Sequence, residues 1–154
     1  MEIIKITGRP DSQILNSIFS LYCEVFDAID ETYFYERLNS RFCWLTLLAY
    51  EGEKLVGFKM GYALDADTFY SWLGGVRSSC RKQGIGQILI DRQLQQAEEM
   101  GYSRVRTKTR NRFREMLILN LRNGFDVVDC YVDRTGEHKI TLEKRLGDLV
   151  VSNR

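Results

Sequence analysis

The sequence predicts an α/β fold of the α+β kind, in which helices flank a mixed, mostly antiparallel sheet. Two observations predict it. Strand-like segments form hairpins toward both ends of the chain, and a strand–helix–strand crossover lies between them. With 154 residues and no linker rich in serine or glycine, the chain is expected to form a single domain over residues 1–154.

The first half of the chain is expected to contain a strand, two helices and a hairpin. Apolar residues from Ile14 to Phe26 recur at helical spacing after Pro10-Asp11-Ser12, which is a typical helix start. The hairpin turns at Glu51-Gly52-Glu53-Lys54. In chain order these elements cover residues 2–7, 10–26, 31–38 and 43–64.

The second half is expected to contain a strand, a helix, a strand, a helix and a closing hairpin. Gly101 and Gly124 end the two helices, as glycine often does at a helix C-terminus. In chain order these elements cover residues 68–76, 84–100, 102–109, 112–123, 125–133 and 139–146. The complete order is β-α-α-β-β-β-α-β-α-β-β.

Composition excludes several classes of protein. The net charge of +1 gives no global field for nucleic acid, and no segment approaches the roughly 20 apolar residues that span a bilayer. The N-terminus lacks the pattern of a secretory signal, so a cytoplasmic protein is expected. The cysteines have no metal-ligand spacing and His138 is the only histidine, which predicts reduced thiols and no metal site.

A cationic turn with glycines precedes the helix expected at 84–100. Arg81 and Lys82 lie beside Gly84 and Gly86, where the unpaired N–H groups of a helix start carry partial positive charge. Two interpretations stay open at this point: a cradle for a phosphate, or a solvated basic turn. The spacing matches neither a Walker loop nor a Rossmann fingerprint.

The pattern R-x-x-G-x-G from Arg81 to Gly86 resembles the acyl-CoA pyrophosphate loop of the GNAT superfamily of N-acetyltransferases. The strand ending at Val76 precedes it, and "NRFREMLILNLRNGF", from Asn111 to Phe125, looks like the second motif of that family. The resemblance covers most of the chain and is weakest before Cys43. It implies an acyltransferase that moves an acetyl group from acetyl-CoA to a primary amine of a small molecule or peptide, by direct attack.

The resemblance also implies which residues bind the cofactor. Backbone N–H groups would hold the pyrophosphate with help from Arg81 and Lys82, and Asn111 would contact the cofactor. The pantetheine arm would pair with the backbone of the strand that ends at Val76. The residues of these two backbone segments are Gln83, Gly84, Ile85, Gly86 and Gln87 for the pyrophosphate, and Gly74, Gly75 and Val76 for pantetheine. Two structural alternatives stay open: a bulge at Gly74-Gly75, and an N-cap role for Asn111.

The sequence identifies only some of the catalytic groups that the reaction needs. The N–H of Val76 would bind the oxyanion, and strict alternation would put Thr68, Tyr70, Trp72, Gly74 and Val76 on one face of their strand. Tyr70 stands where some family members carry a glutamate base, and with an unperturbed pKa near 10 it is a poor base at neutral pH. The general base therefore stays open, with a water relay to an acidic residue as one route.

Asn120 stands where many members of the family carry a tyrosine acid, four residues before Gly124. Its amide could donate a hydrogen bond to the thioester sulfur, but it cannot give the sulfur a proton. The alternative is a buried asparagine bonded to backbone.

The acceptor side is expected between the first two helices. Acidic residues there could attract a cationic amine, and aromatic residues could pack around it. An ordinary acidic helix start with core aromatics is the favoured alternative. The candidate substrate-binding residues are Asp30, Glu31, Tyr33 and Trp72.

Two other classes of function stay open. The missing tyrosine favours an acyl-CoA-binding regulatory module without turnover. The cations between Arg104 and Arg114 suggest a nucleic-acid-binding module, against which the near-neutral net charge argues. Neither nucleic acid nor a membrane is the expected partner, and whether the chain forms a homodimer is left open.

Overall fold

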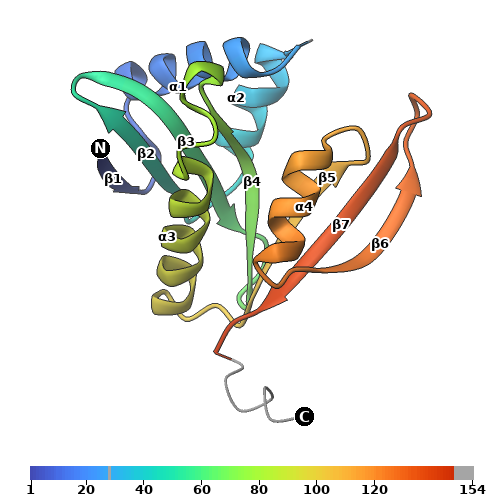
Figure 1. Ribbon diagram of the computed structural model, residues 1–154. Coiled ribbons are helices and arrows are strands. Elements are labelled where there is room, and N and C mark those ends of the chain that lie inside the picture. Colours follow the sequence, from blue (N-terminus) through green and yellow to red (C-terminus); the bar gives the residue numbers. More distant parts are fainter. Residues whose placement is uncertain (28, 148–154) are drawn as a thin grey trace. The chain divides into compact units, whose positions relative to one another are not determined.

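The computed structural model of the chain describes residues 1–27 and 29–147; residues 28 and 148–154 of the expected domain lie outside the described residues. Figure 1 shows the elements. They are β1 (Glu2–Thr7), α1 (Ser12–Val25), α2 (Glu31–Ser40), β2 (Leu45–Glu51), β3 (Lys54–Ala63), β4 (Thr68–Val76), a 3-10 turn (Ser78–Cys80), α3 (Ile85–Glu99), β5 (Arg104–Arg110), α4 (Arg114–Arg122), β6 (Asp126–Val132) and β7 (His138–Arg145). The predicted order is confirmed, and the 3-10 turn is the element that the sequence did not reveal.

The strands form a mixed sheet in the order β1-β2-β3-β4-β5-β7-β6. The pairs β1–β2, β2–β3, β5–β7 and β6–β7 are antiparallel, whereas β4 and β5 are parallel because α3 carries the chain back between them. The mostly antiparallel α+β sheet that the sequence predicts is therefore confirmed.

The described residues group into two compact units. The first comprises residues 1–63 and 72–93, and the second comprises residues 64–71 and 94–147. Strand β4 contributes to both. Its first four residues, Thr68–Ser71, pair with Arg104–Thr107 of β5 inside the second unit, and its last five belong to the first.

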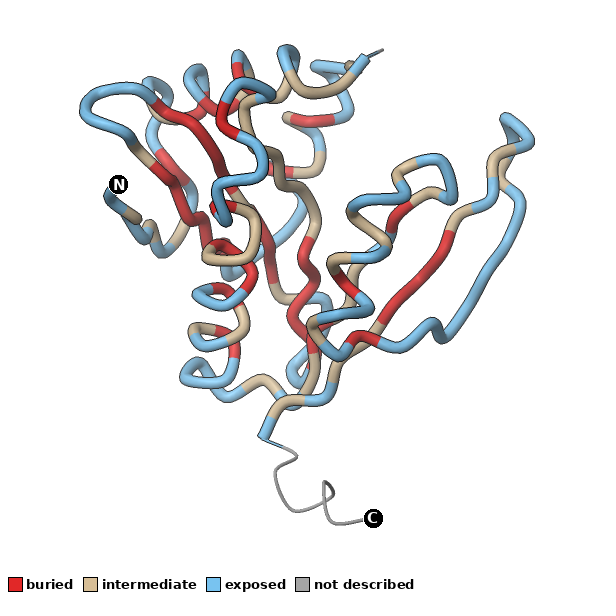
Figure 2. Tube along the Cα trace, in the orientation of Figure 1, coloured by how far each residue is buried: buried red, intermediate tan, exposed pale blue. Residues whose placement is uncertain are grey.

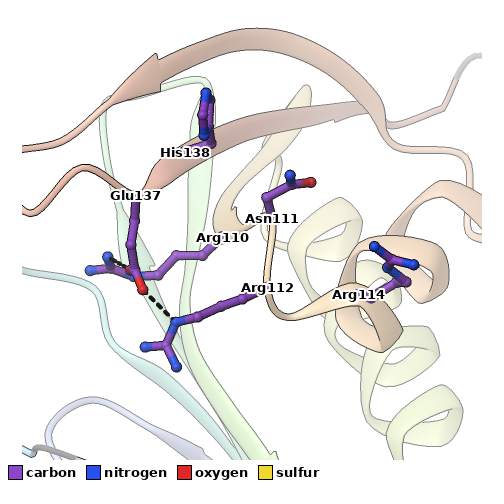
Figure 3. A pocket seen from close by; sticks show the side chains of 6 residues that line it. All are labelled: Arg110, Asn111, Arg112, Arg114, Glu137 and His138. Atoms are coloured by element: carbon purple, nitrogen blue, oxygen red, sulfur yellow. Dashed lines mark hydrogen bonds and ion pairs between the residues drawn. The ribbon is translucent and has the colours of Figure 1, made fainter.

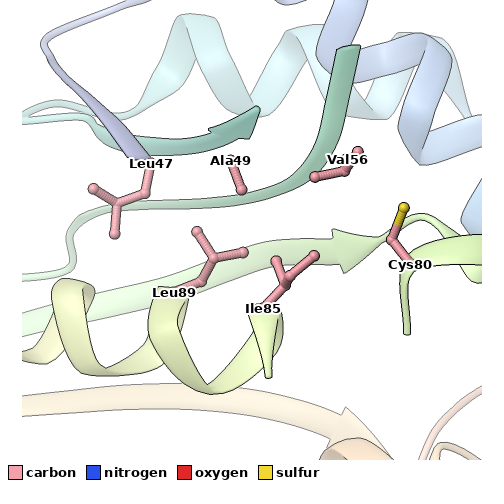
Figure 4. Packing of buried hydrophobic residues seen from close by; sticks show 6 residues of the cluster. All are labelled: Leu47, Ala49, Val56, Cys80, Ile85 and Leu89. Carbon is pink, nitrogen blue, oxygen red and sulfur yellow. The ribbon is translucent and has the colours of Figure 1, made fainter. Parts of the chain in front are cut away.

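In the first unit, the part of helix α3 up to Gln93 covers one face of the sheet. A cluster of buried residues joins the two, shown in Figure 4: Leu47, Ala49, Val56, Cys80, Ile85 and Leu89. Helices α1 and α2 pack on the other face, where the Phe19 and Phe34 rings meet at 5.3 Å. Because both faces are covered, residues 45–49 of β2 are all buried, and the strand reads as nearly continuous apolar sequence.

In the second unit, β7 is the buried strand and β6 is the edge. Leu142 of β7 and Val105 of β5 are fully buried, whereas every residue of β6 is exposed (Figure 2). Ion pairs cross the outer strands: Arg106 pairs with Glu143, and Arg110 donates to Asp133 at 2.8 Å. The second unit thus has a small core and a solvated hairpin.

Candidate active site

The turn before α3 has the backbone geometry of an anion cradle. Lys82 and Gly84 both lie in the left-handed region, with φ of +64° and +81°. A β-carbon on Gly84 would meet nothing within 4 Å, so the backbone conformation, rather than crowding, favours glycine there. The first bond of the α3 ladder runs from the N–H of Ile88 to the carbonyl of Gly84 at 3.1 Å. The N–H groups of Ile85 and Gly86 therefore precede the ladder and face the open end of the helix.

The charges around this turn divide into a structural and an exposed set. Arg77 pairs with Glu24 and donates to the carbonyl of Leu55 at 2.9 Å, so it anchors the end of β4. Arg81 and Lys82 are exposed, and Arg81 Nε donates to the carbonyl of Val76 at 3.3 Å. Two cations thus lie at the positive end of α3, an arrangement suited to a phosphate group.

The glycine pair in β4 breaks the alternation of the strand. Trp72 packs against Phe34 of α2 at 5.5 Å between ring centroids, and a β-carbon on Gly75 would meet Val25 of α1 at 3.2 Å. Trp72 and Gly75 are three residues apart, so regular alternation would put them on opposite faces of the sheet. Both instead face the side that α1 and α2 cover, which indicates a bulge between them. The single face expected from Trp72 through Val76 is therefore wrong, because Val76 packs against the α3 cluster on the other side.

Lys59 is a residue of this region that the sequence analysis missed. It lies on β3 two positions from Gly57, whose open side faces Ile85 and Leu89 of α3. A β-carbon on Gly74 would lie 3.4 Å from Lys59 Cγ and 3.6 Å from its Nζ. Both ends of the lysine stem are thus close to one point, so the stem lies across the bare glycine. A lysine in a strand sequence gives no signal of this placement.

Tyr33 and Trp72, which are expected on the acceptor side, both lie beside the guanidinium of Arg37. Arg37 of α2 donates to the hydroxyls of Tyr33 and Tyr62, and its guanidinium lies 5.8 Å from the centre of the Trp72 ring. Tyr33 is 47% exposed, whereas Phe34 is 1% exposed and belongs to the core. The charge beside Tyr33 and Trp72 is therefore positive. Arg37 carries no signal of this placement in the sequence.

The two acidic candidates are placed differently from that expectation. The side chain of Asp30 caps α2 by accepting from the N–H of Tyr33 at 3.1 Å, and Glu31 is the exposed first residue of the helix. Both positions are typical of an acidic helix start, which the sequence analysis gave as the favoured alternative.

The second unit holds the remaining candidates. Asn111 does not cap α4: the helix begins at Arg114 with Phe113 at the cap position, so the N-cap alternative is wrong, and the N–H of Asn111 donates to the carbonyl of His138 at 3.0 Å. Asn111 lines a pocket of about 290 Å³ that Figure 3 shows. The other residues lining it are Arg110, Arg112, Arg114, Glu137 and His138.

Asn120 and Tyr70 are both buried in this unit. Asn120 is 4% exposed on α4, and its side-chain amide makes no hydrogen bond to any residue that the structure describes. The alternative of a backbone-bonded asparagine therefore has no support among these residues. Tyr70 is 9% exposed and pairs in register with Arg106 of β5. Their approach to the cofactor loop stays a prediction.

Three arginines of the second unit form ion pairs with acidic residues. Arg106 and Arg110 have the acidic partners given above, and Arg112 pairs with Glu137 at 2.7 Å. A row of paired arginines is a weak site for a phosphate backbone, which argues against the nucleic-acid alternative. Within residues 1–27 and 29–147, no helix is long and apolar enough to cross a membrane, and no three His, Cys, Asp or Glu residues gather as metal ligands. All four cysteines are free thiols.

Comparisons with known proteins bear on both the sequence and the fold. A family model described as the acetyltransferase (GNAT) family matches residues 13–117. No curated protein sequence matches the chain. One similar structure is the ribosomal-protein-S18-alanine N-acetyltransferase from Escherichia coli, with a TM-score of 0.76 at 15% identity, covering 93% of this chain and 94% of that one.

Two further similar structures contain the cofactor. A GNAT family acetyltransferase from Elizabethkingia anophelis with acetyl-CoA bound has a TM-score of 0.72 at 20% identity, with 94% of this chain and 98% of that one covered. An aminoglycoside 6'-N-acetyltransferase complexed with coenzyme A has a TM-score of 0.74 at 16% identity, with 94% and 97% covered. At these identities the likeness concerns the fold.

Proposed function

The chain belongs to the acetyltransferase (GNAT) family, and from this premise we propose that it is a cytoplasmic N-acetyltransferase that acetylates a primary amine of a small molecule or a peptide. Acetyl-CoA is the co-substrate of the family. Two of the similar structures have names that state an acceptor, a ribosomal-protein alanine in one and an aminoglycoside in the other. Both kinds of amine are therefore compatible with this fold.

The observation that carries the proposal is the turn from Arg81 to Gly86. Two of its residues are left-handed, the N–H groups of Ile85 and Gly86 precede the first bond of the α3 ladder, and two exposed cations stand beside them. This is what the pyrophosphate of acetyl-CoA requires. In the same unit, β4 continues past the end of its β5 ladder at Ser71, so the backbone of Gly74, Gly75 and Val76 is available to an extended pantetheine arm.

In the proposed reaction the neutral amine of the acceptor attacks the thioester carbonyl directly. The N–H of Val76 donates to the oxygen that becomes negative, and the cluster around Arg37, Tyr33 and Trp72 forms part of the acceptor side. The attacking nitrogen loses its proton to water. The leaving sulfur needs a hydrogen bond or a proton from the protein, and Asn120 of α4 is placed in this role by its motif position.

Binding and turnover separate this proposal from the regulatory alternative. Acetyl-CoA should raise the melting temperature of the protein, since a ligand that binds only the native state stabilises it. Release of free CoA with one or more amines from a panel of amino acids, peptides and aminoglycosides would establish the enzyme. Tight binding without turnover on any of them would favour the regulatory module, and no thermal shift at millimolar acetyl-CoA would contradict both.

Replacing Asn120 tests its role at the leaving sulfur. Asn120→Ala is expected to lower turnover by roughly ten- to hundredfold, because one hydrogen bond to a charged group contributes roughly 1.5–3 kcal/mol. Asn120→Tyr is expected to raise turnover and to add an alkaline limb to the pH profile of kcat, since a phenol can donate a proton. Asn123→Ala, at the C-terminal cap of the same helix, is the matched control. Unchanged turnover and acyl-CoA affinity in Asn120→Ala would remove Asn120 from the site.

A further inference from the structure

Lys59 lies where the proposed cofactor arm and the sheet would meet. Its stem crosses Gly74, the first of the three residues whose backbone would pair with pantetheine. A side chain at position 74 would push the lysine away, and the glycine instead lets the ammonium lie against strand β4. The amine therefore lies beside the backbone that the pantetheine arm of acetyl-CoA would follow.

The ammonium of Lys59 has no counter-ion in the described part of the chain. No hydrogen bond or ion pair of those residues involves it, and the side chain is only partly open to solvent. A partly buried cation without an acid is costly unless a ligand supplies the missing partner. Burial lowers the pKa of Lys59 from 10.5 to about 8, with desolvation as the cause.

We propose that Lys59 is the proton donor to the sulfur of CoA when the thioester bond breaks. This inference rests on the proposed function. It supplies the proton donor that the reaction needs, since the amide of Asn120 cannot give a proton. At pH 7 Lys59 still carries its proton, and its pKa lies close to that of a free thiol, about 8.5. A donor and an acceptor of matched pKa exchange a proton readily.

The proposed proton donor and the proposed acceptor site lie on opposite faces of the sheet. Gly57 and Lys59 face α3, whereas Trp72 and its Arg37 partner lie with α2 on the other face. An acceptor bound at the Arg37 cluster would approach the thioester from the α2 face. Lys59 would then reach the sulfur from the α3 face without contacting the attacking amine.

The proton balance of the step is complete. The acceptor nitrogen forms its bond to the acetyl carbon, and the bond between carbon and sulfur breaks with its electron pair on sulfur. Lys59 gives a proton to that sulfur and becomes a neutral amine, and the acceptor nitrogen gives its extra proton to water. Solvent then returns a proton to Lys59 before the next cycle.

The thiol pKa of bound CoA tests the inference without any acceptor. The ultraviolet absorbance of the thiolate is followed against pH in CoA complexes of the wild type, Lys59→Met, Lys59→Arg and Lys54→Met. Lys54 is an exposed lysine at the start of the same strand and serves as the control. A cation within about 4–6 Å lowers the pKa of an acid by roughly 1–3 units. We expect the lowered value in the wild type, Lys59→Arg and Lys54→Met, and a value at least one unit higher in Lys59→Met.

The outcomes of this titration are separable from the proposed function. If the wild type binds no CoA, the proposed function fails. If it binds CoA with the same thiol pKa as Lys59→Met, the role of Lys59 fails and the proposed function stands. With an amine found in the panel, Lys59→Arg should lose at least tenfold in kcat, because a guanidinium keeps the charge but does not release a proton. Full turnover in that variant would overturn the donor role.

Discussion

Valine at position 86 is expected to abolish the stabilisation of the protein by acetyl-CoA while leaving the fold intact. Gly86 is the second residue of α3, ahead of the first ladder bond, and it is partly open to solvent. Its φ is not in the left-handed region, so a valine fits the backbone. The branched side chain would occupy the place where a phosphate oxygen must approach the N–H groups of the helix start.

The size of this effect follows from mass action. A ligand at a hundred times its Kd stabilises the native state by about 2.7 kcal/mol, which is roughly 5–10 °C in Tm for a chain of this length. We expect that shift in the wild type and none in Gly86→Val, measured by thermal unfolding with acetyl-CoA. Gln13→Val places the same side chain at the second residue of α1 and should keep the full shift. A Gly86→Val protein that still binds acetyl-CoA would show that the cradle lies elsewhere.

Leucine at position 57 is expected to destabilise the first unit through overpacking. A β-carbon on Gly57 would already lie 3.1 Å from Ile85 Cγ2, 3.3 Å from Leu89 Cδ1 and 3.4 Å from the carbonyl of Gly75. The rest of a leucine has no space between β3 and α3. Overpacking a dense core costs about 1–3 kcal/mol, occasionally more.

Urea unfolding measures that loss, with Gly57→Ala expected at a smaller value than Gly57→Leu. Lys54→Leu, at the exposed start of the same strand, is the control and should change the free energy of unfolding by less than about 0.5 kcal/mol. Because α3 would have to move, we also expect Gly57→Leu to bind acetyl-CoA more weakly. A Gly57→Leu protein of unchanged stability would mean that α3 packs against β3 less closely than the structure shows.

The element order could be predicted because each element carries its own local signal. Helical spacing, turn residues and the glycines at helix ends lie within a few residues of the structure they specify. The cofactor loop was predictable for the same reason: Arg81 through Gly86 is a continuous stretch whose chemistry depends on its own backbone.

Contacts across strands and helices could not be predicted in this way. Lys59 meets Gly74 through the pairing of β3 with β4, and Arg37 meets Trp72 through the packing of α2 on the sheet. Neither contact can be recognised from the residue types at these positions in the sequence. Trp72 and Val76 were wrongly predicted to share one face, because strict alternation ignores the extra residue that a bulge inserts near Gly74.

Because the side chain of Lys59 crosses Gly74, it fills the space that a side chain at position 74 would occupy. A β-carbon at position 74 would lie 3.2 Å from the carbonyl of Phe58 and in ordinary contact with the Lys59 stem, 3.4 Å from Cγ, so the atoms of a larger side chain would need the space that this stem occupies. Shortening residue 59 would release that space, and enlarging residue 74 would require it. A chain that exchanges this glycine for a residue with a long side chain is therefore expected to carry a shorter residue at position 59 as well.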